Sequence, residues 1–153
     1  MGCLRAATQP VWTARSTGDY SRMDLAEQFN AAPLPFANLM GLEVVEATPE
    51  KVRVRVTVRE ELCTSGGILH GGAVMALADT AGAIGGFLNL PEGTRTTTTD
   101  SKTNFLSAAP VGTVVTAEAT PLKIGKRLSV WRTKVTDESG KLLAFVVQTQ
   151  MVV

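Results

Sequence analysis

The segment that most constrains the fold is residues 66–90, where a glycine-rich turn leads into a long apolar run. We expect a helix over about Gly71–Leu88, and its apolar side chains leave no polar face. A helix that is apolar on all sides is either a membrane span or the buried axis of a fold. Its one ionisable residue is Asp79. Because a buried carboxylate is costly unless it is paired or used, Asp79 is the first candidate functional residue.

Several features favour a core helix over a membrane span. Asp79 lies near the middle of the segment, where a charge opposes membrane insertion. Thr80 and three glycines, at positions 82, 85 and 86, also interrupt the apolar run. Strand-like segments on both sides offer packing partners, and 153 residues suffice for one domain with its own core. We therefore expect no membrane span.

Charge and composition exclude several classes of function. The net charge of +1 provides no basic surface for nucleic acid. Two cysteines and a single histidine provide neither a disulfide framework nor a metal site. We therefore expect a cytoplasmic protein that holds no metal.

The N-terminal residues 1–22 show no apolar periodicity, and we expect a disordered arm ahead of one domain over residues 23–153. Three interpretations of the arm are open. Gly2–Cys3 is typical of a dual-acylation start, but position 6 lacks the Ser or Thr of a myristoylation motif. Scattered arginines are typical of a transit peptide, which leaves organellar targeting open. We favour the third interpretation, which is either an uncut extension or a start codon placed upstream of the real one at Met23.

The rest of the chain alternates in the manner of β-strands. Val52, Val54, Val56 and Val58 all face one way, which indicates a half-buried strand. We predict a short helix over residues 23–30, a connector over 32–41, and strands over 42–47, 51–59, 94–106, 113–122, 127–136 and 141–153. Four consecutive strands after the helix suggest an antiparallel meander. An antiparallel sheet of about six strands wrapped around one long helix is an α+β architecture, the hotdog fold.

One motif carries a resemblance to a known family. The sequence HGGAVMALAD places His70, Gly71 and Gly72 at the start of the helix and Asp79 nine residues after the histidine. This spacing resembles the acyl-CoA thioesterases of the hotdog superfamily, and most of all the phenylacetate-pathway (PaaI-like) group. The resemblance runs from about Phe36 to the C-terminus and includes the segment KTNFL, residues 102–106. It implies an enzyme that hydrolyses an acyl-CoA.

The glycines at the helix start suit a polarising role. The first N–H groups of a helix have no partner within the helix, and the helix dipole adds partial positive charge there. We expect the Gly71 amide to polarise the thioester carbonyl and Gly72 to lie against the substrate. The alternative is a tight turn and close packing only. The resemblance implies a positioning role for His70, whereas a lone histidine before a helix is otherwise a capping or packing residue.

Asp79 is expected to act as a nucleophile or as a general base that activates water. The alternative is a structural Asp bonded to Thr80 or to backbone. Gly71 and Asp79 lie eight residues apart, about 12 Å along a helix. They can serve one carbonyl only if Asp79 comes from a second subunit. We therefore predict a homodimer, or a dimer of dimers, with shared active sites.

Further residues are candidates from the resemblance. Thr64 stands where relatives carry Asn or Gln, and Thr98 aligns with a hydroxyl that positions water in some relatives. Its register is uncertain by one residue within the run Thr96–Thr97–Thr98–Thr99. Lys102, Lys126 and Arg127 are candidates for the coenzyme A phosphates, because ammonium and guanidinium groups bind phosphate; the alternative is that they are surface charges. Asn104 is a candidate for the pantetheine arm, with a bond to backbone as the alternative. Coenzyme A is part of the substrate, and we expect no separate cofactor.

Two other functions compete with hydrolysis. One is a hydroxyacyl-thioester dehydratase on the same fold, against which the spacing from His70 to Asp79 argues. The other is a non-catalytic acyl-CoA sensor, which would keep the pocket and lose the carboxylate. The sequence leaves the acyl group open among aryl, medium-chain and long-chain acids.

Overall fold

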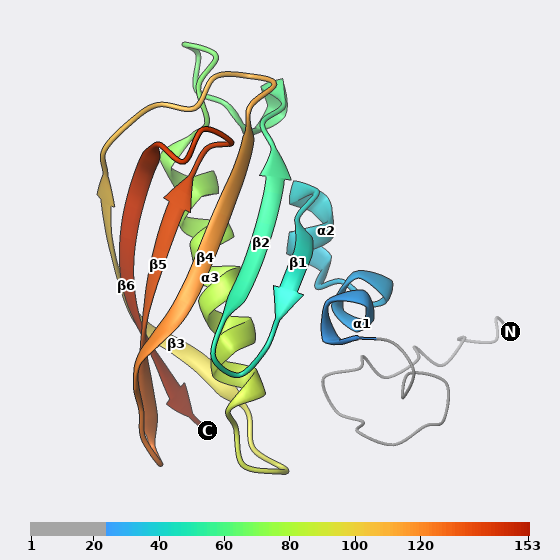
Figure 1. Cartoon of the computed structure of the whole chain (residues 1–153), viewed down its shortest axis with the longest axis vertical. Helices are drawn as coiled ribbons and strands as arrows, with labels where there is room; N and C mark the ends of the chain where they lie inside the picture. The colour runs from blue at the N-terminus through green and yellow to red at the C-terminus, as the bar shows by residue number, and fades with distance from the viewer. Residues whose placement is uncertain (1–23) are drawn as a thin grey trace, which may run out of the picture.

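The computed structural model describes residues 24–153, so the arm predicted over residues 1–22 lies outside the described residues. Within the described part of the chain, six strands form one antiparallel sheet that curves around helix α3 (Gly71–Leu88) (Figure 1). This confirms the predicted α+β hotdog architecture. Helix α3 begins and ends at the predicted residues.

The strands are β1 (Glu43–Ala47), β2 (Val52–Thr57), β3 (Thr96–Phe105), β4 (Val114–Ile124), β5 (Leu128–Thr136) and β6 (Leu142–Val152). Their spatial order is β1-β2-β4-β5-β6-β3. The expected four-strand meander is therefore wrong for one strand, because β3 pairs with β6 and not with β4. The reason is that α3 carries the chain across the concave face of the sheet, so that β3 enters at the far edge.

Two short helices precede the sheet and lie beside β1 (Figure 1). Helix α1 (Leu25–Ala31) was predicted and is closed by a capping box between Asp24 and Glu27. Helix α2 (Pro35–Met40) was not predicted, since its segment was interpreted as a connector. Proline is favourable at the first position of a helix, and Gly41 ends α2 in the left-handed region at φ 71°.

The core lies between the concave face of the sheet and one side of α3. Alternate valines of β2 are fully buried, together with Leu77 and Ala81 of the helix and Trp131 of β5. Helix α3 approaches the sheet closely at Gly85, which has no side chain. A Cβ at this position would lie only 2.6 Å from the Trp131 ring. Helix α3 has the length and composition of a membrane span, but it packs against β2, β3, β4, β5 and β6 as the core helix.

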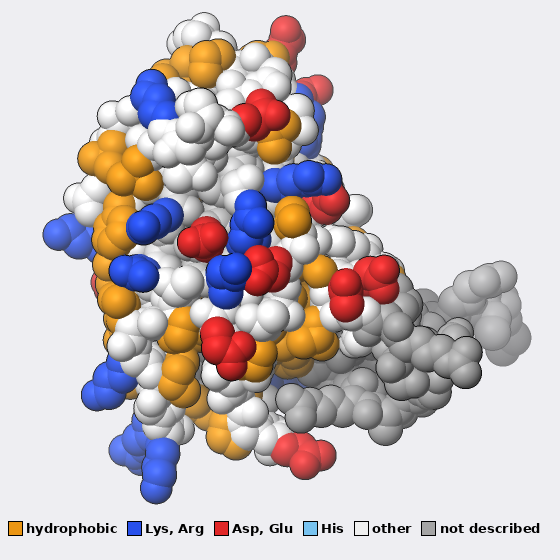
Figure 2. Space-filling view, in the orientation of Figure 1, with side chains coloured by type: hydrophobic (Ala, Val, Ile, Leu, Met, Phe, Trp, Pro, Cys, Tyr) orange, Lys and Arg blue, Asp and Glu red, His pale blue; other side chains and the backbone are white. Residues whose placement is uncertain are grey.

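The outer face of the sheet carries mixed charge. Figure 2 shows Lys and Arg side chains interspersed with Asp and Glu over this face. Arg55 forms a bidentate ion pair with Glu43 of the neighbouring strand, with N–O distances of 2.8 Å. This pairing raises the pKa of Arg55, chiefly through the hydrogen bond to Glu43. Arg55 and Glu43 therefore neutralise one another on this face.

Candidate active site

Within the described residues, the N-terminus of α3 leaves one backbone N–H without an acceptor. His70 is the N-cap, and its Nδ1 accepts a hydrogen bond from Gly72 N at 2.9 Å. The amides of Ala73 and Val74 both donate to the His70 carbonyl. Of the first four N–H groups, only that of Gly71 has no acceptor among the described residues. The histidine thus acts as a cap that engages the Gly72 amide and leaves the Gly71 amide without an acceptor among the described residues.

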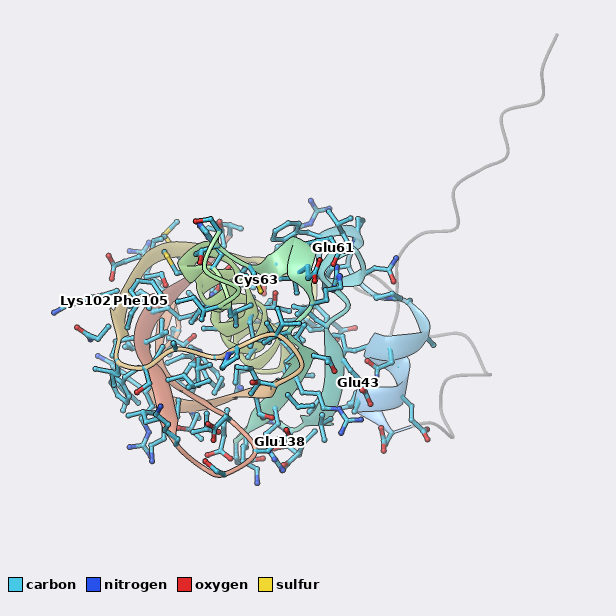
Figure 3. All side chains as sticks on the ribbon, turned by 90° about the horizontal axis from the view of Figure 1, so that it is seen from above. Glu43, Glu61, Cys63, Lys102, Phe105 and Glu138 are labelled. Carbon is cyan, nitrogen blue, oxygen red and sulfur yellow. The ribbon has the colours of Figure 1, made fainter. Side chains whose placement is uncertain are left out.

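An aromatic ring lies against Gly71. A Cβ at this position would lie 3.2 Å from Cζ of Phe105, the last residue of β3. The Phe105 ring is 55% exposed, so it forms an open wall beside the helix start. Figure 3 shows Phe105 and Lys102 on the same side of the molecule. Lys102 and Asn104, two predicted substrate-binding residues, are exposed on this strand.

Asp79 lies two turns further along α3 and is partly buried. Its Oδ1 accepts a hydrogen bond from Thr98 Oγ1 at 2.8 Å and another from Gln148 Nε2 at 3.2 Å. Its Oδ2 accepts none from any described residue. One carboxylate oxygen is therefore held in place, and the other remains available for chemistry.

The bond to Thr98 depends on an irregularity in β3. The pairing register with β6 shifts between Thr98 and Asp100, which makes Thr99 an extra residue, a β-bulge. Thr96 and Thr98 are half-buried toward the helix, whereas Thr97 and Thr99 are exposed. The structure therefore resolves the register that the threonine run left open.

Two glutamines of β6 complete this cluster, and the sequence analysis did not identify them. Gln148 and Gln150 are 0% and 1% exposed. Gln150 Nε2 donates to Thr98 Oγ1 at 2.7 Å, and Gln150 Oε1 accepts from Thr96 Oγ1 at 3.0 Å. The available signal was the alternation of β6, because the buried face that begins at Ala144 continues with Val146, Gln148 and Gln150. Two amides on a buried face require an explanation.

The face of α3 that carries Asp79 is only partly covered by the sheet, through Thr98 of β3 and Gln148 of β6. Met75 is 40% exposed, and Ala76, Asp79 and Ala83 on the same stripe are only partly buried. The helix is therefore not enclosed on all sides, which corrects the expectation from its composition. Next to this face, β3 is an edge strand whose only partner among the described strands is β6.

A cleft of about 480 Å³ opens beside the N-terminus of α3. It is lined by Phe36, Leu39 and Met40 of α2 on one side and by His70, Gly72 and Ala73 on the other. Phe36 and Leu39 are 59% and 71% exposed. Arg59 holds α2 in place, since its guanidinium donates to the carbonyls of Leu39 and Met40 at 2.6 Å each. The cleft is thus walled by apolar side chains on a fixed helix.

Other predicted residues lie away from both clusters. Thr64 is exposed in the turn before α3, where its hydroxyl accepts a hydrogen bond from Gly66 N at 3.3 Å. Lys126 and Arg127 are exposed in the β4–β5 turn. Arg127 lies beside Val152 of β6, whose N–H donates to the Arg127 carbonyl. Lys102 pairs with Val147, five residues earlier on the same strand. This separation is about 16 Å along the strand, so one chain does not bring the four CoA candidates together.

Comparisons with known proteins agree on one family. Residues 66–144 match the thioesterase superfamily. A 1,4-dihydroxy-2-naphthoyl-CoA hydrolase of Listeria monocytogenes is 35% identical over 104 residues, which cover 68% of this chain and 84% of that protein. A thioesterase structure from Haemophilus influenzae has a TM-score of 0.79 at 27% identity, covering 93% of this chain and 94% of that one. The structure of a mutant of the phenylacetic acid degradation protein PaaI from Thermus thermophilus has a TM-score of 0.72 at 28% identity, covering 77% of this chain and 98% of that one.

Proposed function

The chain belongs to the thioesterase superfamily and is a thioester hydrolase, and on this premise we propose that it hydrolyses an acyl-CoA to a free carboxylic acid and coenzyme A. The names of its relatives support this substrate class, since one is a CoA-thioester hydrolase. The observation that carries the proposal is the pair of half-sites on α3. One is the Gly71 amide and the other is Asp79 Oδ2, neither of which has a hydrogen-bond partner in the described part of the chain.

In this proposal the Gly71 amide receives the thioester carbonyl. The carbonyl oxygen gains negative charge when its carbon is attacked. A free N–H at the positive end of a helix stabilises that charge more than it stabilises the neutral carbonyl. His70 contributes by capping the helix, which keeps the neighbouring amides occupied and the Gly71 amide free.

Asp79 of a second chain supplies the attacking group. About 12 Å separates Gly71 from Asp79 within one helix, so the two cannot act on one carbonyl in the same chain. The partly exposed stripe of α3 and the unpaired edge of β3 support a two-fold contact between copies. Such a contact creates two equivalent sites, each with Gly71 from one chain and Asp79 from its partner.

Two reaction courses are consistent with this geometry. In the first, Asp79 Oδ2 attacks the thioester carbon, the carbon–sulfur bond breaks, and water then hydrolyses the mixed anhydride. In the second, Oδ2 takes a proton from a water whose oxygen attacks the carbon, and the departing sulfur receives the proton. Both courses yield one carboxylic acid and one thiol. Thr98 holds Oδ1 in both.

The two ends of the substrate are assigned to different parts of the site. We place an apolar acyl group in the cleft against Phe36 and Leu39, because transfer of apolar surface from water is favourable there. Coenzyme A phosphates are assigned to Lys102 of one chain and to Lys126 and Arg127 of its partner, and the pantetheine arm is assigned to Asn104. Their separation within one chain agrees with a site that two chains share.

A panel of acyl-CoAs with aryl, medium-chain and long-chain acyl groups tests the function. Release of free thiol is measured for the wild-type protein and for Asp79→Ala. Hydrolysis that requires Asp79 supports the proposal. Tight binding without thiol release would instead indicate an acyl-CoA sensor, and loss of water from a hydroxyacyl-CoA would indicate a dehydratase.

A further inference from the structure

We propose that Gln148 and Gln150 are positioning residues that hold Asp79 Oδ1 and direct the Thr98 hydroxyl proton toward it, leaving Oδ2 as the reactive oxygen. This inference rests on the proposed hydrolysis for its kinetic consequence. It concerns the arrangement of the carboxylate, which can also be measured without turnover.

The hydrogen bonds around Thr98 all run toward Asp79. A hydroxyl has a single proton. Because Gln150 Nε2 donates to Thr98 Oγ1 at 2.7 Å, the Thr98 proton is left to point at Asp79 Oδ1, 2.8 Å away. Thr96 donates to Gln150 Oε1 at 3.0 Å, which fixes the orientation of that amide. Every bond in the chain Thr96–Gln150–Thr98–Asp79 therefore donates in the same direction.

The two carboxylate oxygens of Asp79 differ in the hydrogen bonds that they accept. Gln148 Nε2 adds another donor to Oδ1 at 3.2 Å. Two donors on one oxygen and none from the described residues on the other fix the rotation of the carboxylate. Because Asp79 is only partly buried, Oδ2 is the carboxylate oxygen left for reaction. A reacting group held in one orientation avoids the entropy cost of finding it during the reaction.

Packing alone does not account for two buried glutamines on β6. The other buried positions on the same face of β6, Ala144 and Val146, are apolar. Gln148 Oε1 is buried and accepts no hydrogen bond from any described residue, which is a cost that an apolar side chain would avoid.

The helix also makes room for both glutamines. A Cβ at Gly82 would lie 2.4 Å from Gln148 Cδ, and one at Gly86 would lie 3.0 Å from Gln150 Cγ. The glutamines are thus accommodated at a cost on both elements, which indicates that their N–H groups serve the carboxylate.

A double-mutant cycle tests whether Gln150 acts through Thr98. Gln150→Met keeps the volume and removes the hydrogen bonds. We expect kcat to fall about tenfold with KM unchanged, and no further fall when the change is made in Thr98→Val. The same fold loss in both backgrounds would overturn the proposal, as would an unchanged kcat in the single variant.

A matched control is Thr133→Val. Thr133 lies on β5, is also 0% exposed, and has a buried hydroxyl with no hydrogen-bond partner among the described residues. We expect Thr133→Val to leave kcat and KM unchanged. A fall of kcat as large as that in Gln150→Met would show that any polar loss in this core affects turnover, which would overturn the specific role.

A spectroscopic measurement separates this proposal from the proposed function. The side-chain carboxyl ¹³C resonance of Asp79 is recorded at neutral pH in the full-length protein. We expect Gln148→Met and Gln150→Met each to move it, with Gln150→Met having no effect in Thr98→Val. If the wild-type protein hydrolysed no acyl-CoA but these shifts appeared, the proposed function would fail and the positioning role would stand. An unmoved resonance in both variants would overturn the positioning role.

Discussion

Thr98 Oγ1 donates a hydrogen bond of 2.8 Å to Asp79 Oδ1, and this bond joins the edge strand β3 to the central helix α3. It connects a residue that the sequence could not place with certainty to the one acidic residue of the helix. It is possible because the bulge at Thr99 sets the phase of β3, so that Thr98 faces the helix.

Removing this hydroxyl is expected to slow turnover. A hydrogen bond to a charged acceptor contributes about 1.5–3 kcal/mol, so Thr98→Val is expected to lower kcat by about tenfold to a hundredfold. The control is Thr99→Val, because the Thr99 side chain is exposed and its hydroxyl reaches only a backbone carbonyl, at 3.4 Å. Equal losses in the two variants would contradict the role of Thr98.

Asp79→Asn is expected to lower kcat by about 10²- to 10⁴-fold, because the amide can neither attack the thioester nor take a proton from water. Binding of a non-hydrolysable acyl-CoA analogue, measured by calorimetry, is expected to persist. Asp100→Asn, at an exposed position of the same edge strand, serves as the control and is expected to keep wild-type activity. An active Asp79→Asn enzyme would exclude the carboxylate mechanism.

The apolar cleft beside α2 is expected to determine which acyl groups bind well. Leu39→Ser is expected to raise KM about fivefold for substrates with long apolar acyl groups and to leave acetyl-CoA unaffected, since about 1 kcal/mol of apolar contact is lost. Leu122→Ser on β4 is a control at another exposed leucine, 55% exposed, outside the cleft. A KM that is insensitive to Leu39 for every acyl length would place the acyl group elsewhere.

Replacing Gly85 of α3 with alanine is expected to destabilise the protein, which is the opposite of the usual effect of this change in a helix. Replacing Gly with Ala inside a helix ordinarily stabilises by about 1 kcal/mol. At Gly85 the added Cβ would lie 2.6 Å from the buried Trp131 ring, so Gly85→Ala is expected to lower the free energy of unfolding by about 1–3 kcal/mol. Urea denaturation measures the change, with Ala83→Gly on the open face as a reference for helix propensity alone. A stabilised Gly85→Ala protein would contradict the close packing.

Local patterns predicted the elements better than their pairing. The valine alternation of β2 and the apolar run of α3 depend on neighbouring residues, and both were identified within a few residues. The place of β3 beside β6 depends on how α3 crosses the sheet, which no short window of sequence contains. Helix α2 was missed because Pro35 was interpreted as a break, although a proline at the first helical position is favourable.

The candidate site was predicted where one motif carried it and missed where it depended on tertiary contacts. His70, Gly71 and Asp79 stood out because glycine, histidine and a carboxylate on an apolar segment are unusual neighbours. Gln148 and Gln150 are distant from Asp79 in sequence. Gln148 reaches it because α3 packs on β6, and Gln150 reaches it through Thr98 because β6 pairs with β3. The alternation of β6 contained a signal, since polar side chains occupied two positions of its buried face.

A complementation assay tests most directly whether two chains share each active site. Gly71→Pro removes the N–H at the first helical position, where proline is tolerated, and Gly71→Ala controls for the added side chain. Gly71→Pro and Asp79→Asn are each expected to be inactive alone. When the two proteins are unfolded together, refolded and mixed at equal amounts, half of the dimers contain one chain of each kind, and each of these has one intact site. We expect about a quarter of wild-type activity to return. No recovery from a verified mixed dimer would show that Gly71 and Asp79 do not meet between chains, which would contradict the shared site.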